Sequence, residues 1–103
     1  MANKESAVQK ALVDAILKDF PGAYVRKIAQ SMYSHNGIPD LIGCINGNFF
    51  AVEVKTEKGR PSRLQDYEIK LIKEAGGTAL ICYGKDAIPA IVMELHKCKN
   101  MNC

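Results

Sequence analysis

The sequence lacks the features expected of a membrane-spanning, secreted or repeat protein. Its 103 residues contain no apolar run close to the roughly 20 residues that a membrane-spanning helix needs. The first residues include an early acidic side chain and no long apolar block, which argues against a signal peptide. Repeats, low-complexity tracts and linker-like stretches are also lacking. We therefore expect a single soluble domain over residues 1–103, located in the cytoplasm.

The four cysteines lack the paired spacing of a structural zinc site. Cys44 and Cys82 fall inside apolar runs, where a free cysteine behaves as a small buried hydrophobe. Cys98 and Cys103 lie in a polar tail. We expect all four to be reduced thiols, as in cytosolic proteins. Because 48% of the residues are hydrophobic, the chain can build one core without disulfides or a structural metal.

The net charge is small, at +3, so the composition alone does not require a nucleic-acid partner. The positions of the cationic residues are more informative, because six of them lie within residues 55–73. They are Lys55, Lys58, Arg60, Arg63, Lys70 and Lys73. Cations gathered on one face would attract phosphates and make binding depend on salt. Acidic residues are interleaved with them, so a solvated charged surface explains the charge pattern equally well.

Hydrophobic periodicity and turn residues predict seven elements in the order helix, strand, strand, strand, helix, strand, helix. Their ranges are residues 4–19, 23–32, 40–45, 48–55, 62–75, 78–83 and 87–96. Pro89 is compatible with the last helix only if it lies in the first turn. This order predicts an α/β domain with a mixed sheet and helices packed against it.

The clearest hairpin signal is Asn46-Gly47, the residue pair preferred in a two-residue type I′ turn. If these two residues form the turn, counting outward along both strands brings Asp40 opposite Glu53. Their Cβ atoms would then lie about 4.5–5.5 Å apart on one face of the sheet. Lys55 follows Glu53 by two residues, so it projects from that same face. The opposite face would carry the core residues Phe50, Val52 and Val54.

Two carboxylates facing each other on a sheet repel, and a divalent cation would offset that repulsion. A lysine beside such a site can stabilise charge that builds on a phosphate, or help to deprotonate the attacking water. Asp40, Glu53 and Lys55 therefore predict a metal-dependent site for phosphate chemistry. The alternative is an amphipathic hairpin with Glu53 and Lys55 facing solvent and Asp40 as a turn residue.

Pro39-Asp40, followed after a spacer by Glu53-Val54-Lys55, resembles the signature of the PD-(D/E)XK nuclease superfamily. The closer similarity is to the virus-type replication-repair nuclease (VRR-NUC) domain in its short stand-alone form. The similar stretches are residues 37–43, 50–55 and 62–65, together with Glu5 in the first helix. The resemblance implies a restriction-endonuclease-like fold and a DNA endonuclease that depends on Mg²⁺ or Mn²⁺.

The same resemblance assigns roles to individual residues. It implies that Asp40, Glu53 and the Val54 carbonyl bind the metal, and that Lys55 assists hydrolysis. Gln65 matches the family's glutamine after the catalytic strand. It is also the last residue of a Ser62-x-x-Gln65 capping box, and these two roles are compatible.

Glu5 resembles the first-helix acid that completes the metal site in related junction-resolving enzymes. It lies about two helical turns before Leu12, so it projects from the buried side of the helix. The alternative is a first-turn glutamate that only favours the helix dipole. His35, in the polar loop, is expected to be a surface residue, and Tyr67 and Tyr83 to be core or interface aromatics.

The stand-alone family members resemble Holliday-junction resolvases, which implies a branched DNA substrate, a homodimer and a bacterial or phage-infected host cell. Lys58, Arg60 and Arg63 are the predicted DNA contacts. A two-fold dimer would supply the matched active sites that two nicks in a junction require. Its interface would use the second helix or a stripe on the last helix formed by Ile88, Ile91, Val92 and Leu95.

Three other functions stay open at this point. The same fold can carry a flap nuclease or a restriction-like nuclease, which a panel of DNA substrates would distinguish from a junction-resolving enzyme. A non-catalytic nucleic-acid-binding protein is a second alternative, although it would not need Asp40, Glu53 and Lys55 together. A protein-interaction subunit anchored by residues 98–103 is the third.

Overall fold

The structure is a computed structural model that describes residues 4–29 and 36–101, and only the backbone of residues 98–101. Its elements are α1 (Lys4–Asp19), β1 (Tyr24–Lys27), β2 (Leu41–Ile45), β3 (Asn48–Lys55), α2 (Arg63–Glu74), β4 (Thr78–Tyr83), the short 3₁₀ helix η1 (Lys85–Ala87) and α3 (Ile88–Met101). The predicted order of helices and strands is confirmed, with η1 as an addition. His35 lies outside the described residues.

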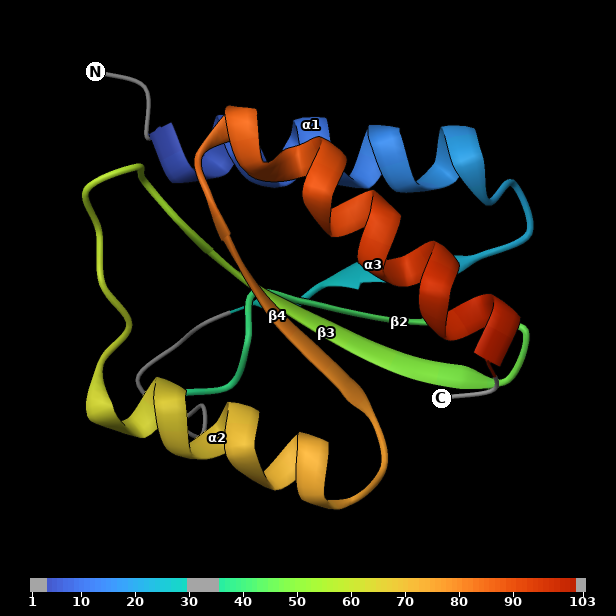
Figure 1. Cartoon of the computed structure of the whole chain (residues 1–103). Coiled ribbons are helices and arrows are strands. Elements are labelled where there is room, and N and C mark those ends of the chain that lie inside the picture. Colours follow the sequence, from blue (N-terminus) through green and yellow to red (C-terminus); the bar gives the residue numbers. More distant parts are fainter. Residues whose placement is uncertain (1–3, 30–35, 102–103) are drawn as a thin grey trace.

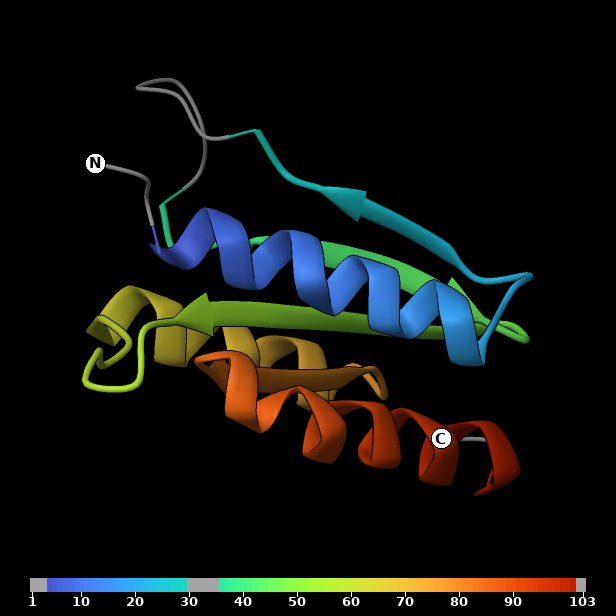
Figure 2. The same ribbon diagram turned by 90° about the horizontal axis from the view of Figure 1, so that it is seen from above.

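The elements form three layers, with α1 and α3 on one face of the sheet and α2 on the other (Figure 1). Seen from above, α1 runs over the middle of the sheet and α3 lies beside it, toward β4 (Figure 2). No helix within the described ranges is long and apolar enough to cross a membrane.

The four strands form one mixed sheet in the order β1-β2-β3-β4. The first three strands are antiparallel to their neighbours, and β4 runs parallel to β3. At the turn between β2 and β3, Asn46 has a φ of 50° and Gly47 a φ of 84°. A type I′ turn needs positive φ at both positions, so the predicted hairpin is confirmed.

The register of the hairpin is also the predicted one. Its paired residues run as far as Leu41, which faces Val52. The ladder ends there, and one further step in the same register brings Asp40 to the level of Glu53. The face of the sheet that carries Glu53 is therefore opposite to the face that carries Val52.

The main core lies between the sheet and the pair α1 and α3. It contains Leu12 and Ile16 from α1 and the predicted β3 residues Phe50, Val52 and Val54, all of them at most 1% exposed. Burying a side chain of this size contributes roughly 1.5–3 kcal/mol to the free energy of unfolding. This core fixes the position of β3 and with it the residues on its other face.

Strand β1 is shorter than the predicted strand over residues 23–32. It ends at Lys27, which pairs with Leu41, the first residue of β2. Residues 28 and 29 are not in a strand, and residues 30–32 lie outside the described part of the chain. The strand stops where its partner strand begins, a limit that the pattern of β-branched residues could not show.

The last helix corrects one prediction about the dimer. It begins at Ile88, one residue later than predicted, and runs on to Met101, with Pro89 in its first turn as expected. The stripe of Ile88, Ile91, Val92 and Leu95 belongs to the core, each residue being at most 9% exposed. The prediction that this stripe is left over for a dimer interface is wrong, because α1 and the sheet already cover it.

The described cysteines are free thiols. Cys82 is buried in the core, and this burial raises the pKa of its thiol to about 11. Cys44 is only half-buried, so the prediction of two buried thiols holds for Cys82 alone. The side chains of Cys98 and Cys103 lie outside the described part of the structure.

Candidate active site

Asp40, directly before β2, is held through both its main chain and its side chain. Its carbonyl oxygen accepts a hydrogen bond from the N–H of Ile28 at 2.8 Å, just beyond the end of β1. Its Oδ2 accepts a hydrogen bond from the N–H of Val54 at 2.9 Å. The second bond ties the carboxylate to the strand that carries Glu53 and fixes its direction.

The loop that leads to Asp40 lies against the first turn of α2. Gly37 in this loop has a φ of 90°, and a Cβ atom there would lie 2.7 Å from the carbonyl carbon of Leu64. No other residue type fits such an approach without a shift of one backbone or the other. This contact brings the segment that carries Asp40 against the helix that carries Gln65.

Glu53 is only 2% exposed, so the alternative of a solvent-facing Glu53 on an amphipathic hairpin is wrong. Residues 50–54 are buried on both faces, because β3 is a central strand and α2 packs on the same face as Glu53. The hairpin register predicts which residues share a face. It does not predict what lies on top of that face.

The two oxygens of the Glu53 carboxylate have different surroundings. Oε2 accepts a hydrogen bond from Gln65 Nε2 at 2.7 Å, and Lys55 Nζ lies 3.3 Å from the same oxygen. Oε1 is buried and has no hydrogen-bond partner. A buried acceptor without a partner costs about 1–3 kcal/mol. One oxygen is therefore satisfied by the protein, and the other is left for a ligand.

The electrostatics of the site also favour a cation. Burial is the largest cause that raises the pKa of Glu53 from 4.5 to about 7, and the negative charge of Asp40 is the next. The hydrogen bond and the charge of Lys55 lower this pKa, and the charge of Glu5 raises it slightly. A strongly perturbed carboxyl group with named charged neighbours is typical of functional sites.

Gln65 closes the expected capping box and also donates a hydrogen bond to Glu53. Its backbone N–H donates to Ser62 Oγ at 3.1 Å, and its Oε1 accepts from the Ser62 N–H at 2.8 Å, which completes the capping box of α2. Because Oε1 is engaged in this way, the amide nitrogen is the group that faces Glu53. The start of the helix thus orients the donor that holds Oε2 of Glu53.

The oxygen atoms present fit a divalent cation held by two carboxylates. Glu53 Oε1 lacks a partner, Asp40 lies beside it, and Mg²⁺ commonly binds one or two carboxylates and several waters. Among the described side chains, those of residues 4–29 and 36–97, no three His, Cys, Asp or Glu side chains are grouped to hold a metal ion. Glu5 acts on Glu53 through its charge, and its role as a direct ligand stays a prediction.

The comparison with known families agrees with this geometry. The VRR-NUC domain profile matches residues 2–86, which is most of the chain. The chain belongs to the VRR-NUC family. The family is one of nucleases, so the fold described above is that of a nuclease domain.

Solved structures extend the comparison. One VRR-NUC domain superposes with a TM-score of 0.74 at 26% identity, covering 89% of this chain and 97% of that one. A second VRR-NUC domain protein gives a TM-score of 0.71 at 17% identity over 94% and 91% of the two chains. The Holliday junction resolvase Hjc of the archaeal hyperthermophile Archaeoglobus fulgidus gives 0.59 at 18% identity over 77% and 67%, a likeness in fold. Among curated proteins, none matches the sequence significantly.

The predicted DNA contacts of this VRR-NUC domain lie on one stretch of chain beside the site. Lys58, Arg60 and Arg63, which we call the loop cations, are exposed on the connection from β3 to the start of α2. Arg60 donates to the carbonyl oxygen of Gly59 at 2.8 Å. Tyr67 on α2 is 55% exposed, in keeping with an interface aromatic, whereas Tyr83 is half-buried.

Two hydrogen bonds in the site could not be predicted from the sequence. The bond from the Val54 N–H to Asp40 and the bond from Gln65 to Glu53 join residues 14 and 12 positions apart. Neither spacing belongs to a local pattern, so only the packing of α2 on the sheet reveals these contacts. The available signal was the capping box, which fixes where α2 begins and which way the Gln65 side chain turns.

Proposed function

We propose that this protein is a divalent-metal-dependent, structure-selective DNA endonuclease that resolves Holliday junctions. The observation that carries the proposal is the Glu53 carboxylate. It is buried, one oxygen is bound by Gln65 and Lys55, and the other oxygen has no partner. Such a group beside Asp40 favours a bound cation over a purely structural role.

In the proposed site, Asp40, Glu53 and the Val54 carbonyl would hold Mg²⁺ or Mn²⁺, with Glu5 as a further acidic residue near the site. A bound ion would supply a water of lowered pKa and would offset the negative charge of a phosphoryl group. Asp40 is kept in place by its bond to the Val54 N–H, so its position does not depend on the ion.

Lys55 and Gln65 supply the remaining chemistry. Lys55 Nζ lies 3.3 Å from Glu53 Oε2 and is 15% exposed, so it is close to the carboxylate and open to a ligand. We propose that it stabilises the charge on the attacked phosphate or assists in deprotonating the water. Gln65 keeps Oε2 of Glu53 engaged, which leaves Oε1 as the oxygen offered to the metal.

The choice of branched DNA rests on the likeness in fold to the Hjc resolvase and on symmetry. A four-way junction needs two matched nicks, and a two-fold homodimer of a small domain offers two matched sites. The exposed apolar side chains of α2 support an interface on that helix, since Leu64, Tyr67 and Leu71 are 40–55% exposed. We propose that this dimer acts in the cytoplasm of a bacterial or phage-infected cell.

The test is cleavage of a panel of four-way junction, flap, nicked and linear duplex DNA, with Mg²⁺, with Mn²⁺ and with a chelator. Paired symmetric nicks in the junction that require the metal would support the proposal. Cleavage of flaps alone would favour the flap-nuclease alternative. Binding of DNA without cleavage under all conditions would favour a non-catalytic nucleic-acid-binding protein.

A further inference from the structure

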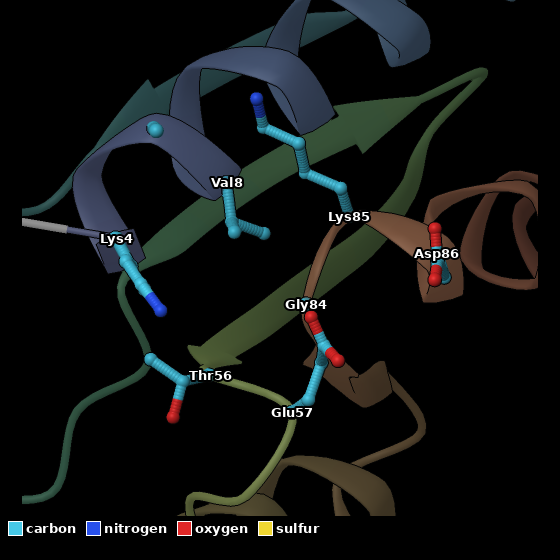
Figure 3. Close-up of a pocket in the computed structure, with 8 residues that line it drawn as sticks. Lys4, Val8, Thr56, Glu57, Gly84, Lys85 and Asp86 are labelled. Carbon is cyan, nitrogen blue, oxygen red and sulfur yellow. The ribbon is translucent and has the colours of Figure 1, made fainter.

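A hollow next to the candidate active site is lined by lysines that the proposed chemistry does not use. Its volume is about 390 Å³, and it lies between the start of α1, the residue after β3 and the turn after β4, with Lys4, Thr56 and Lys85 on its walls (Figure 3). An adjoining hollow of about 280 Å³ shares Lys4 and Thr56 and adds Lys58. We call the two together the lysine hollow.

The lysine hollow begins directly beyond the catalytic strand. Thr56 follows Lys55 in the sequence, and the Lys55 carbonyl oxygen accepts a hydrogen bond from the Gly84 N–H at 2.8 Å. Because β3 and β4 are parallel, their carboxyl ends meet at the same edge of the sheet. A strand of DNA seated on Asp40 and Lys55 would therefore reach this edge next, with Lys58 leading on to the other loop cations.

The charges of the lysine hollow are not neutralised by ion pairs. Lys4, Lys58 and Lys85 are exposed, and none of them pairs with a carboxylate in the described part of the chain. Two acidic residues, Glu57 and Asp86, also line the hollow, so three positive charges stand against two negative ones. The Lys4 amine reaches toward Thr56, whereas the Glu57 carboxylate turns toward Gly84 (Figure 3).

We propose that the lysine hollow binds a backbone phosphodiester of the DNA strand, next to the one that is cleaved, through Lys4 and Lys85. This inference rests on the proposed function, because it assumes that DNA lies on Asp40 and Lys55. Lysine amines recognise a phosphate as point charges, and such contacts set the position of a strand without reading its sequence. Lys4 and Lys85 are thus positioning residues that act on binding and not on the chemical step.

The experiment measures the affinity of a fluorescent four-way junction over a series of salt concentrations, in a chelator so that no cleavage occurs. The test variant is Lys4→Ala with Lys85→Ala. Its matched control is Lys18→Ala with Lys97→Ala, which removes two exposed lysines from the far end of α1 and from α3. Losing one neutralised phosphate makes the salt slope shallower by about 0.9, so we expect a change of about 0.9 for the test variant and no change for the control.

Cleavage with Mg²⁺ adds a second readout. In the test variant, KM should be higher and kcat unchanged. In Glu57→Gln, DNA binding should be tighter, because a negative charge is removed from the hollow. A loss of kcat at unchanged KM would overturn the proposal. So would an equal loss of affinity in the control, because the effect would then follow net charge alone.

The outcomes also separate this inference from the proposed function. If the test variant binds as the wild type does while alanine at the loop cations weakens binding, the proposed phosphate site at Lys4 and Lys85 is excluded and the proposed function is unaffected. If the wild-type protein neither binds nor cleaves any DNA in the panel, the proposed function fails and the inference fails with it.

Discussion

Replacing Glu53 by glutamine tests the buried carboxylate directly, through the stability of the metal-free protein. The pKa of Glu53 rises from 4.5 to about 7 on folding, chiefly because of burial and the charge of Asp40. At about 1.36 kcal/mol for each tenfold change in proton affinity, this rise corresponds to about 3 kcal/mol. Glutamine has the same shape and no charge, so the free energy of unfolding of Glu53→Gln should not depend on the ionisation of residue 53.

The sign follows from linkage. The folded protein binds the proton on Glu53 more tightly than the unfolded chain does, so protonation of this group favours folding. Its contribution to the free energy of unfolding is fully present below pH 4.5 and is lost as the pH rises to about 7. In Glu53→Gln this loss is absent, and the variant should gain on the wild type by up to about 3 kcal/mol across that interval.

Urea unfolding in a chelator, followed by circular dichroism below pH 4.5 and above pH 7, measures the difference. Glu74→Gln, on an exposed residue of α2, is the matched control and should follow the wild type at every pH. Added Mg²⁺ should restore the stability of the wild type above pH 7 and not that of Glu53→Gln. A stability difference between wild type and Glu53→Gln that does not change with pH would refute the reasoning.

Three further predictions concern the helix cap, the DNA and the assembly. Gln65→Glu keeps an acceptor for the Ser62 N–H but replaces the amide group that donates to Glu53 with a carboxylate oxygen. Cleavage should therefore fall about 100-fold, while the helix content measured by circular dichroism stays unchanged. Alanine at all three loop cations should weaken junction binding and flatten its salt slope by up to about 0.9 for each cation that binds a phosphate, and an unchanged slope would place the DNA elsewhere. Sedimentation at micromolar concentration should give a dimer that Leu71→Lys converts into a folded monomer; a wild-type monomer that still makes paired nicks would contradict the dimer.

Much of the fold followed from local sequence patterns. The predicted bounds of α1 agree with the structure, because its buried residues Val8, Leu12 and Ile16 repeat at helical spacing. Asn46-Gly47 determined the hairpin register, since few residue pairs adopt positive φ twice in succession. From that register the shared face of Glu53 and Lys55 follows by alternation alone.

What the sequence left open depends on contacts between elements far apart in the chain. The burial of Glu53 arises because α2 packs on its face, and no pattern within β3 indicates a helix on that side. The stripe on α3 has the spacing of an interface and equally that of a core helix, and only the packing of α1 beside it decides between them. Lys4 and Lys85 come together with Lys58 for the same reason, at an edge where three separate segments meet.

The central claim is that Asp40 and Lys55 belong to a metal-dependent active site, and single-turnover cleavage of a four-way junction with Mg²⁺ tests it most directly. Asp40→Asn retains an acceptor for the Val54 N–H, and Lys55→Ala removes a partly exposed amine, so both variants should fold and bind the junction. We predict that each lowers the cleavage rate by about 100-fold or more while the affinity for the junction stays close to that of the wild type. A well-folded Asp40→Asn or Lys55→Ala protein that cleaves at the wild-type rate would contradict the account.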